Sequence, residues 1–211
     1  MVKLLEHYFS HNPNIKSELR TIKVRFNDLD LTFCSDNGVF SKDKIDFGSR
    51  TLIDELIKNC NHDFKTVLDV GCGYGFMGIS IAKKYNCKVD MIDVNERAIH
   101  LTKKNISINK VEGKAFVSNI YENVKDKYDL IITNPPIRAG KEVVLKILKE
   151  ASMYLNPDGE LWFVIRKDQG AKSVKKELEN NYNCLVVAKN KGFYVIKAKK
   201  RWLLKVKLIK F

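Results

Sequence analysis

The fold of this chain is decided by residues 66–75, which read TVLDVGCGYG. Val67, Leu68 and Val70 give the first five residues the apolar character of a buried parallel strand, and Gly71, Gly73 and Gly75 follow directly. Glycines at this position let the backbone approach a ligand and turn the amino terminus of the next helix toward it. The stretch therefore predicts a strand, a cofactor-binding loop and a helix.

Strand and helix patterns alternate after this loop. Apolar runs predict further strands at 88–92, 115–117, 128–133 and 160–165. Apolar residues at helical spacing predict helices at 96–109, 142–155 and 171–181, with a turn at 156–159. The last two strands, 184–188 and 193–198, are expected to form a hairpin across residues 190–192. The expected fold class is α/β, with a doubly wound, mostly parallel seven-stranded sheet that ends in a C-terminal antiparallel hairpin strand.

Residues ahead of this sheet predict a small N-terminal cover made of strands and a helix. Residues 21–26 and 29–34 alternate like a hairpin, and residues 49–58 show helical spacing with Ser49 as the expected N-cap. We expect residues 1–211 to form a single domain. Within it, residues 1–60 are the cover and first helix, 64–199 the cofactor-binding and catalytic core, and 200–211 a basic tail.

The charge of the chain favours a polyanionic partner. Lysine and arginine number 38 against 25 aspartates and glutamates, which leaves a formal net charge of +13. Such a surface attracts nucleic acid over about a Debye length, although a lysine-rich composition also serves solubility alone. Arg138 and Arg166 follow two predicted strands and are therefore expected near a bound ligand.

Other classes of protein are disfavoured by the composition. No apolar run is long enough to span a bilayer, and the first residues lack the apolar segment of a signal peptide, so we expect a cytoplasmic protein without membrane contact. The five cysteines are scattered without the spacing of a zinc or redox motif, which predicts reduced thiols and no metal.

A second informative stretch, residues 128–141, reads YDLIITNPPIRAGK. Its apolar run predicts a central strand, and the two prolines prevent continuation as a ladder or a helix. Asn134 precedes Pro135 and is therefore held in extended geometry, so its amide and the neighbouring carbonyls point in a definite direction. A rigid corner that presents acceptors at the carboxyl end of a strand is where α/β proteins bind ligands.

Acidic residues accompany the glycine loop. Asp69 precedes the glycines and suits the ammonium group of a methionine moiety better than a pyrophosphate. Asp93, at the end of the next strand, is placed to accept ribose hydroxyls, and Asn119, after the third strand, is a candidate for an adenine contact. Gly73, Gly75 and Gly78 also match a dinucleotide-binding pattern, but out of phase with the strand.

The chain resembles the class I S-adenosylmethionine-dependent methyltransferases over nearly its whole length. More narrowly, it is similar to the short, single-domain RsmC-like ribosomal RNA guanine-N2 methyltransferases. The motifs that carry the resemblance are Gly38-Val39-Phe40-Ser41, Asp46-Phe47-Gly48-Ser49, Asp69-Val70-Gly71-Cys72-Gly73-Tyr74-Gly75, Asp93-Val94-Asn95-Glu96-Arg97-Ala98 and Asn134-Pro135-Pro136-Ile137-Arg138-Ala139-Gly140-Lys141.

This resemblance implies a Rossmann-like methyltransferase fold, S-adenosyl-L-methionine as the cofactor, and roles for particular residues. Catalysis is assigned to Asn134, Pro135 and Pro136. Cofactor contacts are assigned to Asp69, Gly71, Cys72, Gly73, Gly75, Asp93, Val94, Asn119 and Asn134. Substrate contacts are expected from Phe40, Ile137, Arg138, Lys141 and Arg166. The family often has Asp in place of Asn119 and Phe in place of Ile137, so either Phe40 or Tyr8 replaces the missing stacking ring or the substrate differs.

The expected function is methyl transfer to an exocyclic amine of a nucleobase, with guanine N2 of small-subunit (16S-type) ribosomal RNA preferred. The expected partner is ribosomal RNA or the small ribosomal subunit, and the protein is expected to be a monomer or a weak dimer. The same corner also suits adenine N6, cytosine N4 or a protein glutamine amide. A non-catalytic RNA-binding module of the same fold is a further alternative, and a dehydrogenase is disfavoured.

Overall fold

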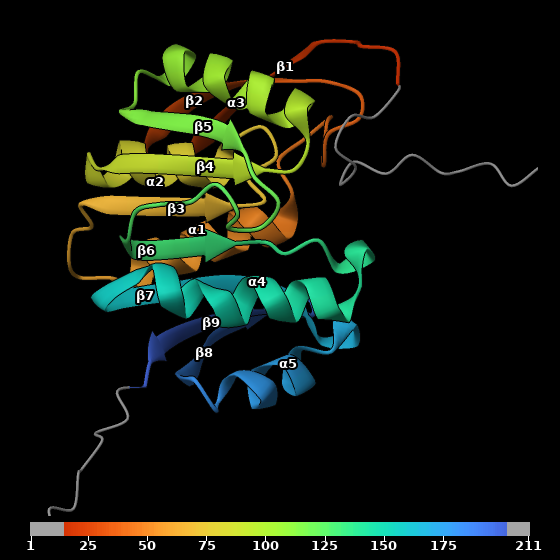
Figure 1. Ribbon diagram of the computed structural model, residues 1–211. Coiled ribbons are helices and arrows are strands. Elements are labelled where there is room, and N and C mark those ends of the chain that lie inside the picture. The colour runs from red at the N-terminus through yellow and green to blue at the C-terminus, as the bar shows by residue number, and fades with distance from the viewer. Residues whose placement is uncertain (1–14, 202–211) are drawn as a thin grey trace, which may run out of the picture.

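The fold is built around one seven-stranded sheet whose parallel strands end at a common edge (Figure 1). A computed structural model describes residues 15–201. The sheet has the order β5-β4-β3-β6-β7-β9-β8. Its strands are β3 (Thr66–Val70), β4 (Lys88–Asp93), β5 (Gly113–Val117), β6 (Tyr128–Thr133), β7 (Leu155–Arg166), β8 (Tyr182–Asn190) and β9 (Phe193–Lys200). The five strands from β5 to β7 are parallel, and β9 and β8 follow antiparallel, so the predicted fold class is confirmed.

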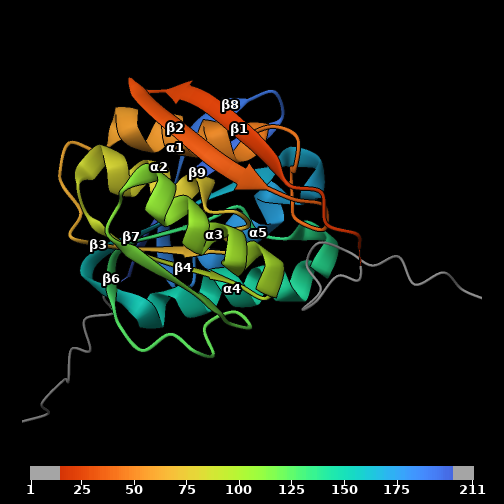
Figure 2. The same cartoon turned by 90° about the horizontal axis from the view of Figure 1, so that it is seen from above.

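Helices cover both faces of the sheet (Figures 1 and 2). One face carries α1 (Phe47–Asn59), α2 (Phe76–Tyr85) and α3 (Glu96–Asn109), and the other carries α4 (Lys141–Tyr154) and α5 (Ala171–Leu178). Short 3-10 turns, η1 (Ile137–Ala139) and η2 (Lys167–Gln169), precede α4 and α5. Because side chains alternate along a strand, Val67 packs beneath one helical layer and Leu68 beneath the other.

The N-terminal cover consists of α1 on the main sheet and a separate hairpin over α2 and α3 (Figure 2). The hairpin strands are β1 (Arg20–Phe26) and β2 (Leu29–Ser35), close to their predicted bounds. Two asparagines of α3 replace a third strand: the amide of Asn105 bonds the N–H and the carbonyl of Cys34, and the amide of Asn109 does the same for Thr32. These four bonds, of 2.7–3.0 Å, satisfy the edge of β2 and fix where the following loop leaves the hairpin.

Three local predictions differ from the structure. The N-cap of α1 is Asp46 rather than Ser49, because the Asp46 side chain accepts a hydrogen bond from the Ser49 N–H. Residues 156–159, predicted as a turn, lie within β7, because Leu155 pairs with Tyr128 before the register shifts. Helix α5 ends at Leu178, earlier than predicted, because β8 begins at Tyr182.

Two expectations concern residues that the structure does not describe. Tyr8 and residues 202–211 of the basic tail lie outside the described range 15–201. Within that range, none of the helices combines the length and apolar character required to cross a membrane.

Candidate active site

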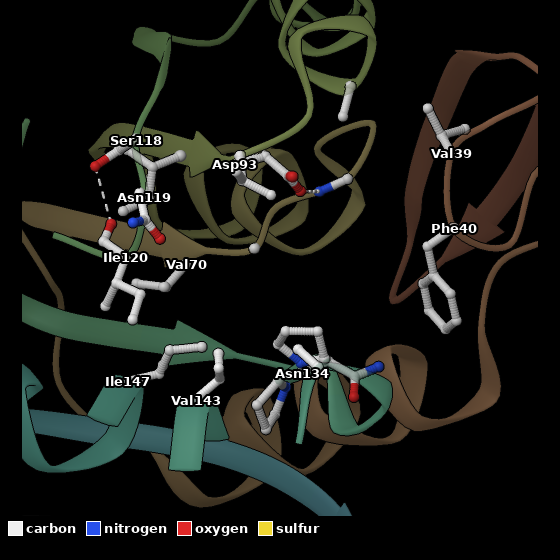
Figure 3. Close-up of a pocket in the computed structure, with 18 residues that line it drawn as sticks. Val39, Phe40, Val70, Asp93, Ser118, Asn119, Ile120, Asn134, Val143 and Ile147 are labelled. Atoms are coloured by element: carbon white, nitrogen blue, oxygen red, sulfur yellow. Dashed lines mark hydrogen bonds between the residues drawn. The ribbon is translucent and has the colours of Figure 1, made fainter. Parts of the chain in front are cut away.

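A cavity of about 280 Å³ opens at the carboxyl ends of β3, β4, β5 and β6 (Figure 3). From β3 the chain proceeds outward to β4 and β5 and then crosses to β6 on the opposite side, so the cavity lies where the strand order reverses. The residues that line it are Val39, Phe40, Val70, Gly71, Gly73, Ile92, Asp93, Val94, Ala98, Ser118, Asn119, Ile120, Asn134, Pro135, Pro136, Ala139, Val143 and Ile147.

The glycine loop supplies a wall made of backbone. Gly71 and Gly73 have φ values of +72° and +56°, a region that other residues adopt only with strain. A Cβ placed on either glycine meets no atom within 4 Å, so both backbones border open space. A side chain at either position would fill this space. Without one, a ligand can contact the main chain directly. Gly75 lies deeper, as the N-cap of α2.

Asp93 braces the loop from the end of β4. Its Oδ2 accepts a 2.9 Å hydrogen bond from the Gly73 N–H, and its Oδ1 accepts one of 2.9 Å from the Asn95 N–H (Figure 3). Each carboxylate oxygen has a second acceptor position, which leaves capacity for ligand hydroxyls in the cavity. Burial raises the pKa of Asp93 to about 6, since removal from water disfavours the charged form.

Asp69 lies behind the loop rather than on the cavity wall. Its Oδ2 accepts a 2.8 Å hydrogen bond from the Gly78 N–H in the first turn of α2. Among the described residues, its buried Oδ1 has no hydrogen-bond partner. Burial raises the pKa of Asp69 to about 7, with the Asp93 charge adding to the effect. For the predicted contact to form, the ammonium group of the cofactor would therefore have to reach Asp69 from beneath the glycines.

The far end of the cavity is formed by the segment after β5. Ser118 is buried and donates through Oγ to the Ile120 carbonyl at 2.9 Å, while Asn119 is exposed at the rim. Ile120 has a φ of +55°, a strained conformation for a β-branched residue, and its side chain faces the cavity (Figure 3). Val143 and Ile147 of α4 close this end with apolar surface, which suits a flat aromatic group.

Cys72 lies in the loop but is not exposed to the large cavity. Its thiol is buried and lies 3.7 Å from the Thr102 hydroxyl. Burial, together with the nearby Asp93 and Asp69 charges, raises the pKa of Cys72 well above its usual value. A thiol held in the neutral form is a poor nucleophile, so the side chain serves packing.

The Asn134 corner is oriented by α1. The Asn134 Nδ2 donates hydrogen bonds of 3.0 Å to Asp46 Oδ2 and 2.9 Å to Ser49 Oγ. Both amide hydrogens are thereby engaged with the protein, which leaves Oδ1 as the atom that accepts from a ligand. Asp46 Oδ2 also accepts the Ser49 N–H at 2.7 Å, so the three residues form one hydrogen-bonded unit.

Asn134 stands at the junction of the cavity and a smaller recess. The recess has a volume of about 40 Å³ and shares Phe40, Gly71, Gly73 and Asn134 with the cavity. Asp46, Ser49, Tyr74, Phe76 and Met77 contribute to its remaining walls. The Asn134 corner therefore faces both spaces.

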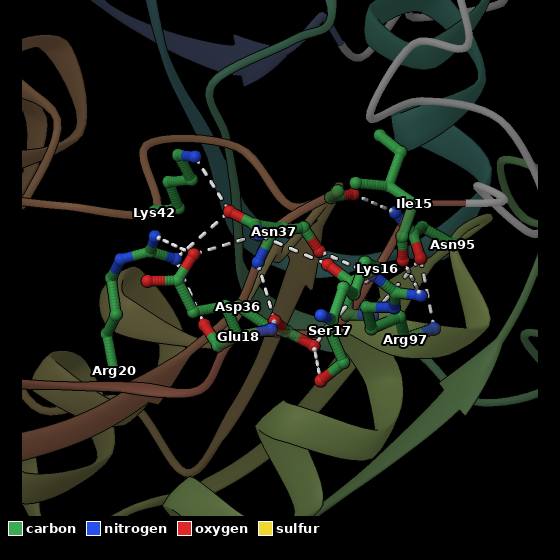
Figure 4. A network of polar contacts seen from close by, with 12 residues as sticks. Ile15, Lys16, Ser17, Glu18, Arg20, Asp36, Asn37, Lys42, Asn95 and Arg97 are labelled. Atoms are coloured by element: carbon green, nitrogen blue, oxygen red, sulfur yellow. Dashed lines mark hydrogen bonds and ion pairs between the residues drawn. The ribbon is translucent and has the colours of Figure 1, made fainter.

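The loop that carries Val39 and Phe40 is tied to the start of α3 (Figure 4). Asn95 Nδ2 donates to the Gly38 carbonyl at 2.8 Å, and Arg97 Nη1 donates to the Asn37 carbonyl at 2.7 Å. Because Asn95 also donates its backbone N–H to Asp93, one hydrogen-bonded chain joins the cavity carboxylate to the loop.

The structure brings only some of the predicted substrate residues to the cavity. Phe40 lines both spaces, with 37% of its surface exposed. Arg138 is exposed in η1, whereas Ile137 in the same turn is half-buried against the core and does not line the cavity. Lys141 is turned toward α5, where it forms a 2.7 Å ion pair with Glu177.

Arg166 is the last residue of β7 and is exposed. Its guanidinium bonds both carboxylate oxygens of Asp168, at 2.9 and 3.0 Å, and lies over the Phe193 ring. The predicted residues Val94, Pro135 and Pro136 are on the cavity wall.

Sequence reasoning missed several residues that shape the site. Asp46 and Ser49 belong to a motif of the resemblance, and Ser49 is expected there only as an N-cap; their bonds to Asn134 give both residues a place in the site. Ile147 belongs to the apolar stripe of the predicted helix and Val143 lies in that helix outside the stripe, and nothing in the local pattern indicated that either residue would line a cavity. Among residues 15–201, no group of three His, Cys, Asp or Glu side chains is arranged to hold a metal ion.

Comparisons with known proteins agree with this geometry. Residues 30–197 match the family described as Methyltransferase small domain. The chain is 46% identical over 200 residues to the uncharacterised Bacillus subtilis protein YbxB, covering 92% of this chain and 98% of that protein. It is 30% identical over 154 residues to the Psychromonas ingrahamii ribosomal RNA small subunit methyltransferase C, covering 71% of this chain and 43% of that protein.

A solved structure is also similar. The Thermus thermophilus 16S rRNA N2 G1207 methyltransferase, in complex with AdoMet and guanosine, superposes with a TM-score of 0.78 at 25% identity, covering 90% of this chain and 52% of that one. The chain thus spans about half the length of the curated methyltransferases that it matches.

Proposed function

This chain belongs to the methyltransferase small domain family, and from that membership we propose that it methylates an exocyclic amine of a nucleobase, with guanine N2 of small-subunit ribosomal RNA as the preferred target. Its cofactor is S-adenosyl-L-methionine. The proposal for RNA rests on the ribosomal RNA methyltransferases that the chain resembles and on its net charge of +13.

The described residues fit this cofactor. The open backbones of Gly71 and Gly73 would border its middle portion, Asp93 would accept hydrogen bonds from its ribose hydroxyls, and Asn119 lies at the rim where an adenine edge is expected. The bound cofactor supplies an electrophilic methyl group on a sulfonium. The residues proposed to hold it are Asp69, Gly71, Cys72, Gly73, Gly75, Asp93, Val94, Asn119 and Asn134.

The observation that carries the catalytic proposal is the orientation of the Asn134 amide. An exocyclic amine on a nucleobase is a weak nucleophile because its lone pair is delocalised into the ring. With Nδ2 held by Asp46 and Ser49, Oδ1 is directed outward to accept one amine hydrogen. The Pro135 carbonyl accepts the other, and the lone pair is then turned away from both acceptors. Positioning of this kind contributes up to about 7–11 kcal/mol in favourable cases.

Pro135 and Pro136 stiffen the corner so that the two acceptors keep their relative positions. Proline fixes φ and restricts the preceding residue, so little conformational freedom is lost when a substrate binds. As the amine gains positive charge during transfer, Asn134 Oδ1 and the Pro135 carbonyl stabilise its hydrogens. Phe40, Ile137, Arg138, Lys141 and Arg166 remain the proposed substrate contacts.

A second candidate is another amino methyltransferase, acting on adenine N6, cytosine N4 or a protein glutamine amide. It is favoured by one observation: Ile137 is half-buried and away from the cavity, so no aromatic ring follows the prolines to stack on a guanine. The acceptors of the corner recognise an –NH₂ group and do not by themselves distinguish these amines.

The test is an incubation of the protein with labelled cofactor and, separately, small ribosomal subunits, free ribosomal RNA, tRNA, DNA or a release factor. We expect label in ribosomal RNA, with mass spectrometry of the digested nucleosides identifying N2-methylguanosine. An Asn134→Ala variant serves as the catalytic control. Label found only in protein would overturn the RNA assignment, and label in another nucleoside would correct the base.

A further inference from the structure

Beside the Asn134 corner lies an exposed cluster of two phenylalanines and two cations. The Phe47 and Phe193 ring centroids are 5.6 Å apart, with the ring planes tilted by 51°. The Arg166 guanidinium lies 5.5 Å from the Phe193 centroid, and the Lys191 ammonium lies 5.1 Å from the Phe47 centroid. We refer to Phe47, Phe193, Arg166 and Lys191 as the aromatic–cationic cluster.

The sheet topology brings this cluster to the catalytic edge. Strand β9 is antiparallel to β7, so its first residue, Phe193, pairs with Arg166 at the carboxyl end of β7. Strand β6, which ends just before Asn134, is the other neighbour of β7. Two strand spacings, about 10 Å, therefore separate the Phe193 strand from the strand that carries Asn134.

Gly48 provides a closer connection between the two regions. A Cβ on Gly48 would lie 2.8 Å from Phe193 Cε1 and 3.1 Å from Asp46 Oδ2. Asp46 Oδ2 is the atom that holds the Asn134 amide. The cluster and the catalytic corner thus meet at one glycine of α1, and the cluster borders the corner directly.

The exposure of the two rings is unusual for this protein. The other phenylalanine pairs, such as Phe26 with Phe76, are buried, whereas Phe47 is 36% exposed and Phe193 is half-buried. Leu185 and Met153, which are also strongly exposed, are aliphatic and offer no ring for a base to stack on. Paired rings with paired cations are the combination that stacks bases and neutralises phosphates in single-stranded nucleic acid.

The two cations are not equivalent. Arg166 is held in place by Asp168, whose carboxylate bonds it at two points, so its charge is already compensated. Lys191 is exposed and, among the described residues, has no acidic partner, so its ammonium is available to a phosphate. When Lys191 turns toward a phosphate, the face of Phe47 that it covers becomes free for a base.

We propose that the aromatic–cationic cluster binds a nucleotide that flanks the target base in single-stranded RNA, with the base on Phe47 and Phe193 and its phosphate on Lys191. This inference rests on the proposed function, and it adds a stacking surface for a neighbouring nucleotide, not for the target base. The roughly 10 Å offset from the corner separates this nucleotide from the base that enters the cavity.

The experiment measures the affinity of the cofactor-loaded protein for a fluorescein-labelled single-stranded RNA of about ten nucleotides, by fluorescence anisotropy. The test variants are Phe47→Leu with Phe193→Leu, which remove the rings but keep apolar packing, and Lys191→Gln. We expect the double variant to bind RNA about tenfold more weakly, the size of one lost stacking contact, with unchanged cofactor affinity.

The same hairpin offers matched controls. Tyr194 follows Phe193 directly but packs on the opposite face of the sheet, with the Lys189 ammonium 5.1 Å from its ring. Tyr194→Leu and Lys189→Gln remove one ring and one charge from the same strands without touching the cluster. These controls are expected to bind RNA within twofold of the unmodified protein, and Phe193→Tyr is expected to retain affinity.

The outcomes separate this inference from the proposed function. If the unmodified protein neither binds nor methylates RNA, the proposed function fails and the cluster inference fails with it. If the unmodified protein methylates RNA and the double variant binds RNA equally well, only the cluster inference is overturned. If the double variant unfolds, the RNA affinities of Lys191→Gln and Lys189→Gln are compared instead. Equal RNA affinities for those two would reject the inference.

Discussion

The carboxyl edge of the sheet has two halves of different construction. In the half built on β3, β4 and β5, the ligand surface is main chain and partly or fully buried side chains, such as Gly71, Gly73 and Asp93. In the half built on β6, β7 and β9, it is exposed or half-buried side chains, such as Arg138, Arg166 and Phe193. An enclosed wall of backbone suits one small ligand of constant shape, whereas exposed rings and cations suit part of a much larger one.

Asn134 lies at the boundary between these halves. Its backbone follows β6, while its amide is positioned by Asp46 and Ser49 from the cover. Substitutions in the first half are therefore expected to change cofactor affinity, those in the second half RNA affinity, and those at the boundary the rate of transfer.

The largest effect is expected at the boundary itself. Asn134→Ala removes the acceptor Oδ1 and should lower the rate of methyl transfer by about 10²–10³-fold, the usual loss when one oriented polar contact to a transition state is deleted. Cofactor affinity, measured by calorimetry, should stay within threefold, and Asn183→Ala, an exposed asparagine of β8, should change neither quantity. Turnover equal to that of the unmodified protein would remove Asn134 from the mechanism.

The half built on β3, β4 and β5 is best tested by a substitution at Gly71. Gly71→Val introduces a branched side chain at a φ of +72° and fills the open space of the cavity, so cofactor affinity should fall by about 100-fold, or roughly 3 kcal/mol. Gly170→Val is the matched control, because Gly170 has a φ of +89° and equally open surroundings outside the cavity. Both variants should melt at lower temperature, but only the first should lose cofactor. Equal cofactor affinities of the two variants would show that valine acts through backbone strain and not by filling the open space of the cavity.

The pH dependence of cofactor binding tests the other element of that half. The pKa of Asp93 is raised to about 6 by burial, and ligand hydroxyls bond its charged form. Protonation therefore competes with binding, and affinity should fall about tenfold as the pH decreases from 7 to 5. Titration calorimetry on Asp93→Asn should show a shallower profile over this range, and what remains would come from Asp69, whose pKa is raised to about 7. Asp90→Asn, in the middle of the same strand, should keep the full profile. An unchanged profile in Asp93→Asn would assign the titration to another group.

A smaller effect is expected from the support of the Asn134 amide. Ser49→Ala removes one of two acceptors for Nδ2 and leaves Asp46 in place, so the maximal rate should fall about fivefold, corresponding to about 1 kcal/mol. Single-turnover kinetics with saturating RNA and cofactor measure this rate directly. Affinities for both ligands should be unchanged, since Ser49 orients the amide without replacing it. A lower affinity for either ligand would mean that Ser49 contacts it.

The sheet was predictable because its central strands have strong local signals. The run at 130–132 is continuously apolar and that at 66–70 is apolar except for Thr66 and Asp69, as is typical of strands buried on both faces, and glycines follow the first run directly. The start of α1 was less predictable, because Asp46 and Ser49 are both good capping residues. In the structure Asp46 is the N-cap, and both residues accept hydrogen bonds from the side chain of Asn134, which is far along the chain.

The site was predictable only where its residues follow strands. Asp93, Asn119 and Asn134 lie at strand ends, and parallel strands deliver their ends to one edge, so the structure brings these residues together. Phe47 and Phe193 come from α1 and β9, and no local periodicity relates them. Their meeting depends on the antiparallel placement of β9, which was expected, and on the contact at Gly48, which leaves no trace in the local pattern.

The hydrogen-bonded chain from Asp93 through Asn95 to the Gly38 carbonyl has a thermodynamic consequence for how strongly two ligands bind together. A ligand that bonds Asp93 also steadies Asn95 and, through it, the loop that carries Phe40 toward the substrate. The loop then loses less conformational entropy when the second ligand binds, so a ligand at one position strengthens binding at the other. Because such coupling is reciprocal, a ligand that contacts the Phe40 loop would strengthen binding at Asp93 by the same free energy, whichever of the two ligands binds first.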